Sequence, residues 1–312
     1  MAGGLASLAP VRTPARPGPG PLPEAALRAL DLSVRRRITA LLAGEFRSSQ
    51  LGEATELAQL RPYVPGDDDV RRIDWNATAR TGEPHVRVDV AERALTAWLV
   101  LDTSASMHFG SADRRKADVA EGVVLALGNV ASRRGNRLGL VTFGGSSPAM
   151  VRPRQGRAGL VGTLLTLRQE SEPGQDGATS LGAALERTFK YARQTAHLSI
   201  LTDLRGPIDW AIPLARLAAR HDVLVIEMRD PREDELPNVG ELALVDPETG
   251  KQLRVDTRSK RLRERFAKAA ADDRARQVAA VRRAGAEHLV LPTEGEWLKP
   301  LLAAMARRRR GR

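Results

Sequence analysis

Oxygen-bearing side chains recur at every second position of one short segment. Asp102, Ser104 and Ser106 follow the apolar run 95–101, which is typical of a buried strand. If the chain stays extended, side chains at alternate positions project toward the same side. Carboxylate and hydroxyl oxygens without His or Cys favour Mg²⁺ or Mn²⁺ over zinc. The segment is therefore a candidate cage for a hard cation.

Two further segments carry side chains of the same kind. Asp203 closes the strand predicted over 197–202, and Thr179 stands in a Gly-containing loop at the start of a predicted helix. Ligands of open α/β sheets bind outside the carboxyl ends of the strands, where Asp102 and Asp203 are both expected. The alternative is purely local, because Ser104 and Thr179 are also residues that cap helices. The three segments together favour a metal site.

Strands and helices alternate from residue 95 onward, and this pattern predicts the architecture that would position those oxygens. Short apolar strands separated by amphipathic helices imply right-handed crossovers and a sheet covered on both faces. We expect a doubly wound α/β fold with a mostly parallel sheet. The predicted strands cover 95–101, 137–143, 197–202 and 223–228, and the predicted helices cover 112–133, 158–168, 179–195 and 208–220.

The C-terminal third is less regular. Residues 241–245 and 252–256 read as a hairpin, and a charged helix over 258–283 follows it. A strand over 287–291 and a helix over 297–307 then complete the pattern. We therefore expect one domain over 95–306 with a hairpin and charged-helix insertion at about 239–284, followed by a basic tail over 307–312.

The N-terminal part has few apolar residues. Residues 1–23 are rich in Pro, Gly and Ala and predict a disordered lead-in. Residues 24–94 are expected to form an appendage packed on the next domain, with a helix over 31–43, a loop over 61–69, a short helix over 72–80 and a strand over 85–90.

Composition limits the classes of protein that this chain can be. No cysteine is present among the 312 residues, so disulfides, thiolate metal sites and Cys nucleophiles are excluded. The apolar runs are shorter than the roughly 18 to 20 residues that a spanning helix needs. The N-terminus does not read as a secretory signal, so a cytoplasmic protein is expected.

The net charge of +11 is concentrated near the C-terminus. Residues 258–283 hold ten Lys or Arg against three Asp or Glu, and five arginines stand in 307–312, so the remainder is close to neutral. A solvated helix face followed by a disordered tail is the simpler interpretation. A patch for nucleic acid, anionic lipid or an acidic partner is the alternative.

Enzyme classes find little support. A haloacid-dehalogenase phosphatase needs a second acid two residues after Asp102, where this chain has Ser104. No G-x-S-x-G elbow and no G-x-x-x-x-G-K-[ST] loop occurs, and the five His residues form no ligand pair at helical spacing. We expect no enzyme, no catalytic residue and no small-molecule substrate.

The metal constellation resembles that of a known family. A D-x-S-x-S segment after the first strand, Thr179 in a G-x-T-x-L loop and Asp203 after a later strand look like the metal-ion-dependent adhesion site of von Willebrand factor type A domains. The resemblance implies that Ser104, Ser106 and Thr179 bind the metal directly and that Asp102 and Asp203 support it. In that family a partner supplies an Asp or Glu as the last ligand. One departure is Leu204, where many of these domains have Gly, and a different local backbone is expected there.

A second resemblance narrows the family. Residues 60–68 and 71–80 closely resemble the hallmark segment of the bacterial Domain of Unknown Function 58, and the resemblance covers about 34–228. Such proteins place a von Willebrand A-like fold after this segment and are commonly encoded beside a MoxR-type AAA+ ATPase. The resemblance implies a chaperone-like pair that remodels or activates other proteins.

Two functions of different classes follow. The leading one is a metal-dependent protein-interaction module that works with the AAA+ ATPase and presents Mg²⁺ or Mn²⁺ to an Asp or Glu of the ATPase or of a client protein. The alternative is a basic adaptor for nucleic acid or a membrane surface, which acts through 258–283 and 307–312 and holds a structural metal.

The hallmark segment itself allows two interpretations. We expect Asp74 to form an ion pair with Arg72 or Arg80, and Trp75 to be the buried anchor that packs the segment on the main domain. The alternative is a surface that docks a partner, made of Tyr63, Asp67, Asp68 and Asp69.

Overall fold

The chain divides into two units. The computed structural model describes residues 14–30, 57–66, 68–89, 96–132, 136–145, 148–155, 180–245 and 251–306. One unit comprises residues 1–41 with 95–312, and the other comprises residues 42–94. The helices predicted over 31–43 and 158–168 lie outside the described residues.

A six-stranded sheet forms the centre of the larger unit, in the order β10-β7-β6-β3-β4-β5. Five strands run parallel and β5 pairs antiparallel with β4 at one edge. The predicted α/β fold with a mostly parallel sheet is confirmed. The strands are β3 (Thr96–Asp102), β4 (Arg137–Phe143), β5 (Met150–Gln155), β6 (His197–Thr202), β7 (Asp222–Arg229) and β10 (Glu287–Pro292).

Sequence periodicity did not predict β5. This strand contains Pro153 and carries charged residues at Arg152 and Arg154, so it lacks the apolar run of its neighbours. An edge strand has one unpaired side, and there a proline without an N–H group is tolerated. The other strands of this sheet have the predicted positions to within one residue at either end, whereas residues 57–62 of the smaller unit form a strand that was not predicted.

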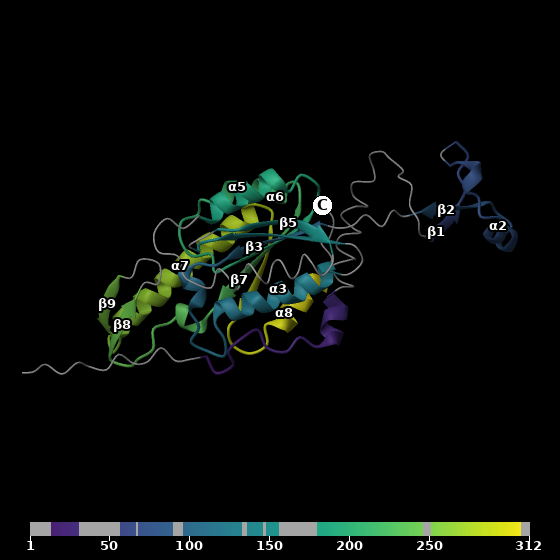
Figure 1. The fold of residues 1–312 in the computed structure, drawn as a ribbon. Coiled ribbons are helices and arrows are strands. Elements are labelled where there is room, and N and C mark those ends of the chain that lie inside the picture. The colour runs from purple at the N-terminus through teal and green to yellow at the C-terminus, as the bar shows by residue number, and fades with distance from the viewer. Residues whose placement is uncertain are drawn as a thin grey trace, which may run out of the picture. The chain divides into compact units, whose positions relative to one another are not determined.

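Helices cover both faces of the sheet (Figure 1). On one face lie α3 (Lys116–Ser132) and α8 (Leu298–Ala306). On the other lie α5 (Leu181–Tyr191), α6 (Ala211–Ala218) and the end of α7 (Lys260–Arg283). These helices are shorter than their predicted ranges, because the residues that precede them, such as Ser180 before α5, are caps and bends.

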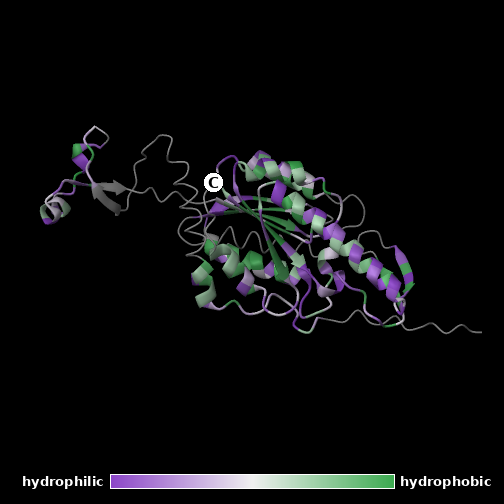
Figure 2. Ribbon diagram, turned by 180° about the vertical axis from the view of Figure 1, so that it is seen from behind, coloured by the Kyte–Doolittle hydropathy of each residue, from purple (hydrophilic) through white to green (hydrophobic). Residues whose placement is uncertain are grey.

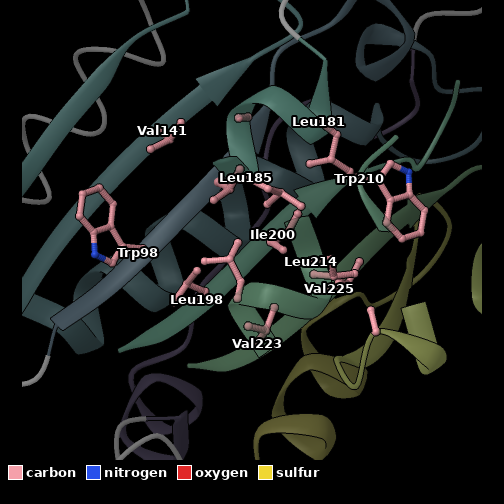
Figure 3. Close-up of a cluster of buried hydrophobic side chains, with 14 of the residues drawn as sticks. Trp98, Val141, Leu181, Leu185, Leu198, Ile200, Trp210, Leu214, Val223 and Val225 are labelled. Carbon is pink, nitrogen blue, oxygen red and sulfur yellow. The ribbon is translucent and has the colours of Figure 1, made fainter. Parts of the chain in front are cut away.

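The hydrophobic core between the sheet and α5 and α6 is built from the apolar faces of these elements (Figure 3). Trp98, Ile200 and Val225 of three neighbouring strands belong to the same buried cluster as Leu185 of α5 and Leu214 of α6. Ala280 and Val281 of α7 join the same cluster. Burying these side chains fixes the strand order, and the strand order fixes which residues meet at the carboxyl edge.

The charged helix has two different halves. Its last turns bury Gln277, Ala280 and Val281, whereas its first turns are mostly polar and exposed, as the hydropathy colours of Figure 2 show. A hairpin of β8 (Glu241–Val245) and β9 (Gln252–Asp256) precedes it with the predicted bounds. The hairpin and α7 lie between β7 and β10 in the chain, and the last turns of α7 pack against the core.

The N-terminal lead-in differs from its prediction. Residues 1–23 were expected to be disordered, but Ala15 and Arg16 donate backbone hydrogen bonds to Ala112 and Asp113. The indole N–H of Trp297 donates to the carbonyl of Pro19 at 3.0 Å. Residues 24–30 are helical, and Leu30 is fully buried. Pro and Gly in this segment therefore shape an ordered path for residues 14–30 rather than preventing one.

Within its described residues, the smaller unit pairs β1 (Leu57–Pro62) with β2 (His85–Asp89) and contains the 3₁₀ helix η1 (Val70–Arg72) and the short helix α2 (Trp75–Thr81). Asp74 accepts hydrogen bonds from the backbone N–H groups of Asn76 and Ala77, both at 3.0 Å, and so caps α2. Trp75 is 68 % exposed, so it is not buried within the smaller unit, and its predicted packing on the main domain stays a prediction. As the first residue of α2, Trp75 projects away from the helix face that buries Ala77.

Candidate functional site

The predicted oxygen ligands lie where two adjacent parallel strands end. Strand β3 pairs with β6 from Ala97 opposite His197 to Leu101 opposite Leu201, so Asp102 and Thr202 follow at the same level. From β3 the chain proceeds to β4 on one side, whereas β6 leads to β7 on the other. The strand order thus reverses between β3 and β6, which is the position where open α/β sheets bind ligands.

Both carboxylate oxygens of Asp102 are held by the protein. Oδ1 accepts a hydrogen bond from the backbone N–H of Ser104 at 3.0 Å. Oδ2 accepts one from the hydroxyl of Thr202 at 2.7 Å, and Thr202 Oγ1 in turn accepts from the N–H of Leu204 at 3.1 Å. Asp102 is therefore fixed in one orientation at the end of β3.

The two serines lie side by side. Ser104 Oγ and Ser106 Oγ are 3.0 Å apart, and both residues are buried. Ser104 precedes the 3₁₀ helix η2 (Ala105–His108), but its side chain makes no capping hydrogen bond. The capping alternative therefore does not account for Ser104, whose hydroxyl remains next to that of Ser106.

Thr179 was predicted either as a metal ligand or as the cap of the following helix. The N-cap of α5 is Ser180, whose hydroxyl accepts from the N–H of Ala183 at 3.2 Å. Thr179 itself lies outside the described residues. The structure thus brings Asp102, Ser104, Ser106 and Asp203 together at one edge of the sheet, all four of them buried.

The backbone around these residues adopts conformations that favour glycine. Leu204 has φ 57°, the left-handed value that Gly would adopt without strain. Leu204 therefore has a backbone conformation that glycine would also adopt. Gly144 has φ 80°, and a Cβ atom there would lie 2.9 Å from Asp102 Oδ1 and 2.8 Å from Ser104 Cβ. The segment after β4 can thus approach the oxygen cluster only with glycine at position 144.

Asp203 is already paired with a cation of the protein. Lys116 Nζ, at the start of α3, donates to Asp203 Oδ2 at 2.6 Å and to Glu233 Oε1 at 2.6 Å. The Lys116 side chain is 1 % exposed, so the pair is screened little by solvent. Glu233 belongs to the 3₁₀ helix η3 (Pro231–Glu233) and also pairs with Arg205 at 3.2 Å. The network joins α3, the end of β6 and the segment after β7.

The charges of this cluster are unevenly neutralised. Burial, together with the nearby charge of Asp203, raises the pKa of Asp102 to about 7. Burial alone would lower the pKa of Lys116, but the adjacent carboxylates of Asp203 and Glu233 outweigh it and raise that pKa. Lys116 therefore stays charged and neutralises Asp203. Asp102 accepts hydrogen bonds but has no cation among its described partners.

This set of donors fits a hard cation in its chemistry. Two carboxylates and two hydroxyls offer only oxygen, and the carboxylate of Asp102 lacks a compensating charge. In the described part of the chain, no three His, Asp or Glu side chains gather as metal ligands. A divalent cation held by so few carboxylates would keep a strong affinity for one more from outside.

Sequence reasoning missed several residues of the site. Lys116 stands beside Arg114 and Arg115, and nothing in its local pattern separates it from these neighbours. Thr202 ends a buried strand without any motif, and Gly144 is one of two adjacent glycines after β4. Each of these three residues contacts site residues that are distant from it in the sequence. Their roles become visible only when the strand order is known.

Comparison with known sequences gives one family and close relatives. The profile of the family described as "Protein of unknown function DUF58" matches residues 59–276. An uncharacterized protein of Mycobacterium tuberculosis is 39 % identical over 289 residues, which cover 92 % of this chain and 90 % of that protein. The match therefore extends beyond the hallmark segment into both units.

Solved structures with similar folds have low sequence identity. The conserved hypothetical protein BatB from Bacteroides thetaiotaomicron is similar with a TM-score of 0.44 and 14 % identity, covering 68 % of this chain and 99 % of that one. A von Willebrand factor type A protein from Catenulispora acidiphila has a TM-score of 0.36 and 16 % identity, covering 58 % and 43 %. The order and direction of the strands in the central sheet, rather than these scores, establish the α/β fold.

Hydropathy gives one more finding. No helix within the described ranges combines the length and the apolar character that crossing a bilayer requires.

Replacing Leu204 tests its left-handed backbone. We expect Leu204→Gly to unfold at a higher urea concentration than Leu204→Ala, by about 1 kcal/mol in the free energy of unfolding, because alanine incurs the left-handed penalty and glycine does not. The same two substitutions at Leu201, a buried residue of β6, are the control, and there Ala should be the more stable. Equal stabilities of the two Leu204 variants would contradict the conformation.

Asp102 should make stability depend on pH in the absence of divalent metal. Its folded pKa of about 7 lies above the model-peptide value of 3.8, so the folded protein binds more protons than the unfolded chain between these values. The stability that protonated Asp102 contributes is complete below pH 4 and is lost as the pH rises to 7. Asp102→Asn cannot titrate.

In EDTA, the free energy of unfolding of Asp102→Asn should therefore rise relative to wild type between pH 4 and pH 7, by up to about 1.4 kcal/mol per pH unit. Urea unfolding at each pH measures the difference, and exposed Asp272→Asn is the control. A difference that stays constant with pH would show that Asp102 is ionised throughout this range.

Proposed function

We propose that this chain, which belongs to the DUF58 family, is a protein-interaction module that holds Mg²⁺ or Mn²⁺ at the carboxyl edge of its sheet. Asp102, Ser104 and Ser106 would hold the cation, with Thr179 and Asp203 as the further ligands that the adhesion-site resemblance implies. The cation would accept a carboxylate of a partner protein as its last ligand. The observation that carries the proposal is the buried, oxygen-only cluster around Asp102.

Exposed apolar side chains near the cluster support a protein partner. Phe109 follows η2 directly and is 42 % exposed, and Ile208 and Ile212 lie on the segment from Asp203 into α6. Ile212 is 75 % exposed. Large apolar side chains on the surface beside a polar site are typical of protein-binding surfaces.

The partner that we propose is a MoxR-type AAA+ ATPase or a client protein that the pair remodels. The resemblance to the DUF58 family supplies this partner. Exposed Trp75, with Val64 and Val70 nearby in the sequence and also exposed, gives the smaller unit a candidate docking surface of its own. Its apolar side chains would extend the predicted surface of Tyr63 and the adjacent aspartates.

The alternative adaptor function finds less support in α7. Several of its basic side chains already have partners: Arg276 pairs with Asp273 at 2.7 Å and Lys260 with Glu264 at 3.6 Å. Arg263 donates to the carbonyls of Thr257 and Arg258. Ion pairs such as Arg276–Asp273 and Lys260–Glu264 offset part of the positive charge of this helix, which weakens the case for a nucleic-acid or membrane surface there.

The metal should control association with the partner. In a pulldown with the cognate MoxR-type ATPase and, separately, with candidate clients, wild type should bind in Mg²⁺ and lose binding in EDTA. Ser104→Ala/Ser106→Ala should lose it in both conditions, because two oxygen donors are gone. Ser259→Ala, which removes a hydroxyl from the start of α7, is the control. Binding that survives both EDTA and the double substitution would disprove the metal-dependent function.

Lys116 should weaken the affinity of the site for the cation. Its ammonium lies 2.6 Å from Asp203 Oδ2 and therefore competes with a divalent cation for that carboxylate. Lys116→Met should bind Mn²⁺ more tightly, by about ten-fold or more, which corresponds to roughly 1.4 kcal/mol. Electron paramagnetic resonance of free Mn²⁺ measures the affinity, and circular dichroism checks the fold.

Lys116→Arg, which keeps the charge, is the matched variant and should not gain affinity. Weaker Mn²⁺ binding in a folded Lys116→Met protein would contradict the competition. Absence of any Mn²⁺ binding in wild type and in both variants would instead contradict the metal site itself, so the two failures are distinguishable.

A further inference from the structure

A second charged feature lies on the larger unit, in a hollow between α5 and α6. The hollow has a volume of about 390 Å³ and is lined by Glu186, Phe189, Lys190, Arg193, Arg216 and Arg220. Helix α5 ends shortly before β6 begins, and α6 ends shortly before β7 begins. The lining residues at these helix ends therefore lie at the amino edge of the sheet, opposite the edge that carries Asp102 (Figure 1).

The hollow has an excess of positive charge. Four of its lining side chains are cationic and one is a carboxylate. Within the described residues, Lys190, Arg193 and Arg216 have no ion pair, and Arg220 donates to the carbonyl of Arg193. Like charges gathered without counter-ions repel each other, and an anion that enters the hollow would relieve this repulsion.

An aromatic ring holds two of the cations in place. The Arg216 guanidinium lies 4.5 Å from the centroid of the Phe189 ring, and that of Arg220 lies 5.7 Å from it. Such cation–π contacts orient the guanidinium groups but leave their N–H donors available. The Phe189 ring thus orients the two guanidinium groups to bind a planar acceptor with two oxygens, such as a carboxylate. No carboxylate of the chain itself is needed to orient them.

Helix ends explain only part of this arrangement. A cation near the carboxyl end of a helix is favoured by the helix dipole, and Lys190 and Arg216 both lie in a last turn. Arg193 and Arg220, however, lie beyond the helices, in the connections to β6 and β7. Cations from two separate segments therefore line one hollow. Stabilisation of the two helix ends does not explain why Arg193 and Arg220 lie there.

The chemistry favours carboxylates of a peptide over a nucleic acid. Single-stranded nucleic acid binds to exposed aromatic rings on which its bases stack, together with an extended row of cations. Here the Phe189 ring already has guanidinium groups over it, and the hollow contains Glu186, which would repel a phosphate backbone. Separate carboxylates on a flexible peptide can each reach a cation and avoid Glu186.

We propose that the hollow between α5 and α6 is a binding site for an acidic segment of a partner protein. Several Asp or Glu side chains of that segment would bind Arg216, Arg220, Lys190 and Arg193. The site is separate from the cluster around Asp102 and does not need a metal. Its binding should therefore persist in EDTA and in Asp102→Ala, so this proposal stands or falls independently of the proposed function.

A labelled octaglutamate peptide is the probe, and fluorescence anisotropy with the full chain in EDTA is the measurement. Wild type should bind the peptide with an affinity that falls as salt is raised. Arg216→Glu/Arg220→Glu should weaken binding by roughly ten-fold or more, because two attractive charges become repulsive. Lys190→Glu/Arg193→Glu reverses two other lining charges and should give the same loss, which covers the case in which the first variant does not fold.

The matched control is Arg261→Glu/Arg265→Glu, which makes the same change in net charge on exposed positions of α7. Peptide binding that falls equally in this control would show attraction to overall charge and would overturn the site. An oligonucleotide with the same number of negative charges is the second probe. If it binds as tightly as the peptide and is lost in the same lining variants, the site is a general polyanion site and the peptide proposal is wrong.

Discussion

The ammonium group of Lys116 lies between two carboxylates, and the site depends on this contact. Its bonds to Asp203 and Glu233 join the first turn of α3, the carboxyl end of β6 and the segment after β7. A buried ammonium without such partners would be costly, and so would either carboxylate alone. The three elements therefore hold one another in place at the edge where the predicted ligands meet. The same contact neutralises Asp203 and leaves Asp102 as the carboxylate without a cation in the described structure.

Backbone geometry complements these charges. The hydroxyl of Thr202 bonds Asp102 and also accepts from the N–H of Leu204, so the end of β6 turns at Leu204 while keeping Asp102 oriented. Leu204 has a left-handed conformation although its buried side chain is large. A strained residue that persists in a buried turn shows that surrounding contacts determine its conformation. Gly144 then allows the segment after β4 to approach Asp102 and Ser104. The oxygen cluster is thus preorganised by three strand ends.

The two edges of the sheet have opposite character. At the carboxyl edge, buried oxygens and exposed apolar residues such as Phe109 suit a partner that offers a carboxylate to a cation. At the amino edge, the cations around Phe189 suit carboxylates directly. Both proposed sites would bind acidic groups, although by different chemistry. A charged insertion, formed by β8, β9 and the first turns of α7, adds a third exposed feature that the core does not require.

Local patterns in the sequence predicted five of the six strands of the central sheet, the main helices and the run from Asp102 to Ser106, because burial imposes periods of two and 3.6 residues that can be read within a few positions. Register between strands then placed Asp203 beside Asp102, as the carboxyl ends of parallel strands imply. Tertiary structure alone decided the rest. Lys116 contacts Asp203, which lies 87 positions further along the chain, and residues 14–30 pack against the rest of the larger unit. Trp75 is exposed in the smaller unit rather than buried there. Such contacts depend on how whole elements pack, and no local period records them.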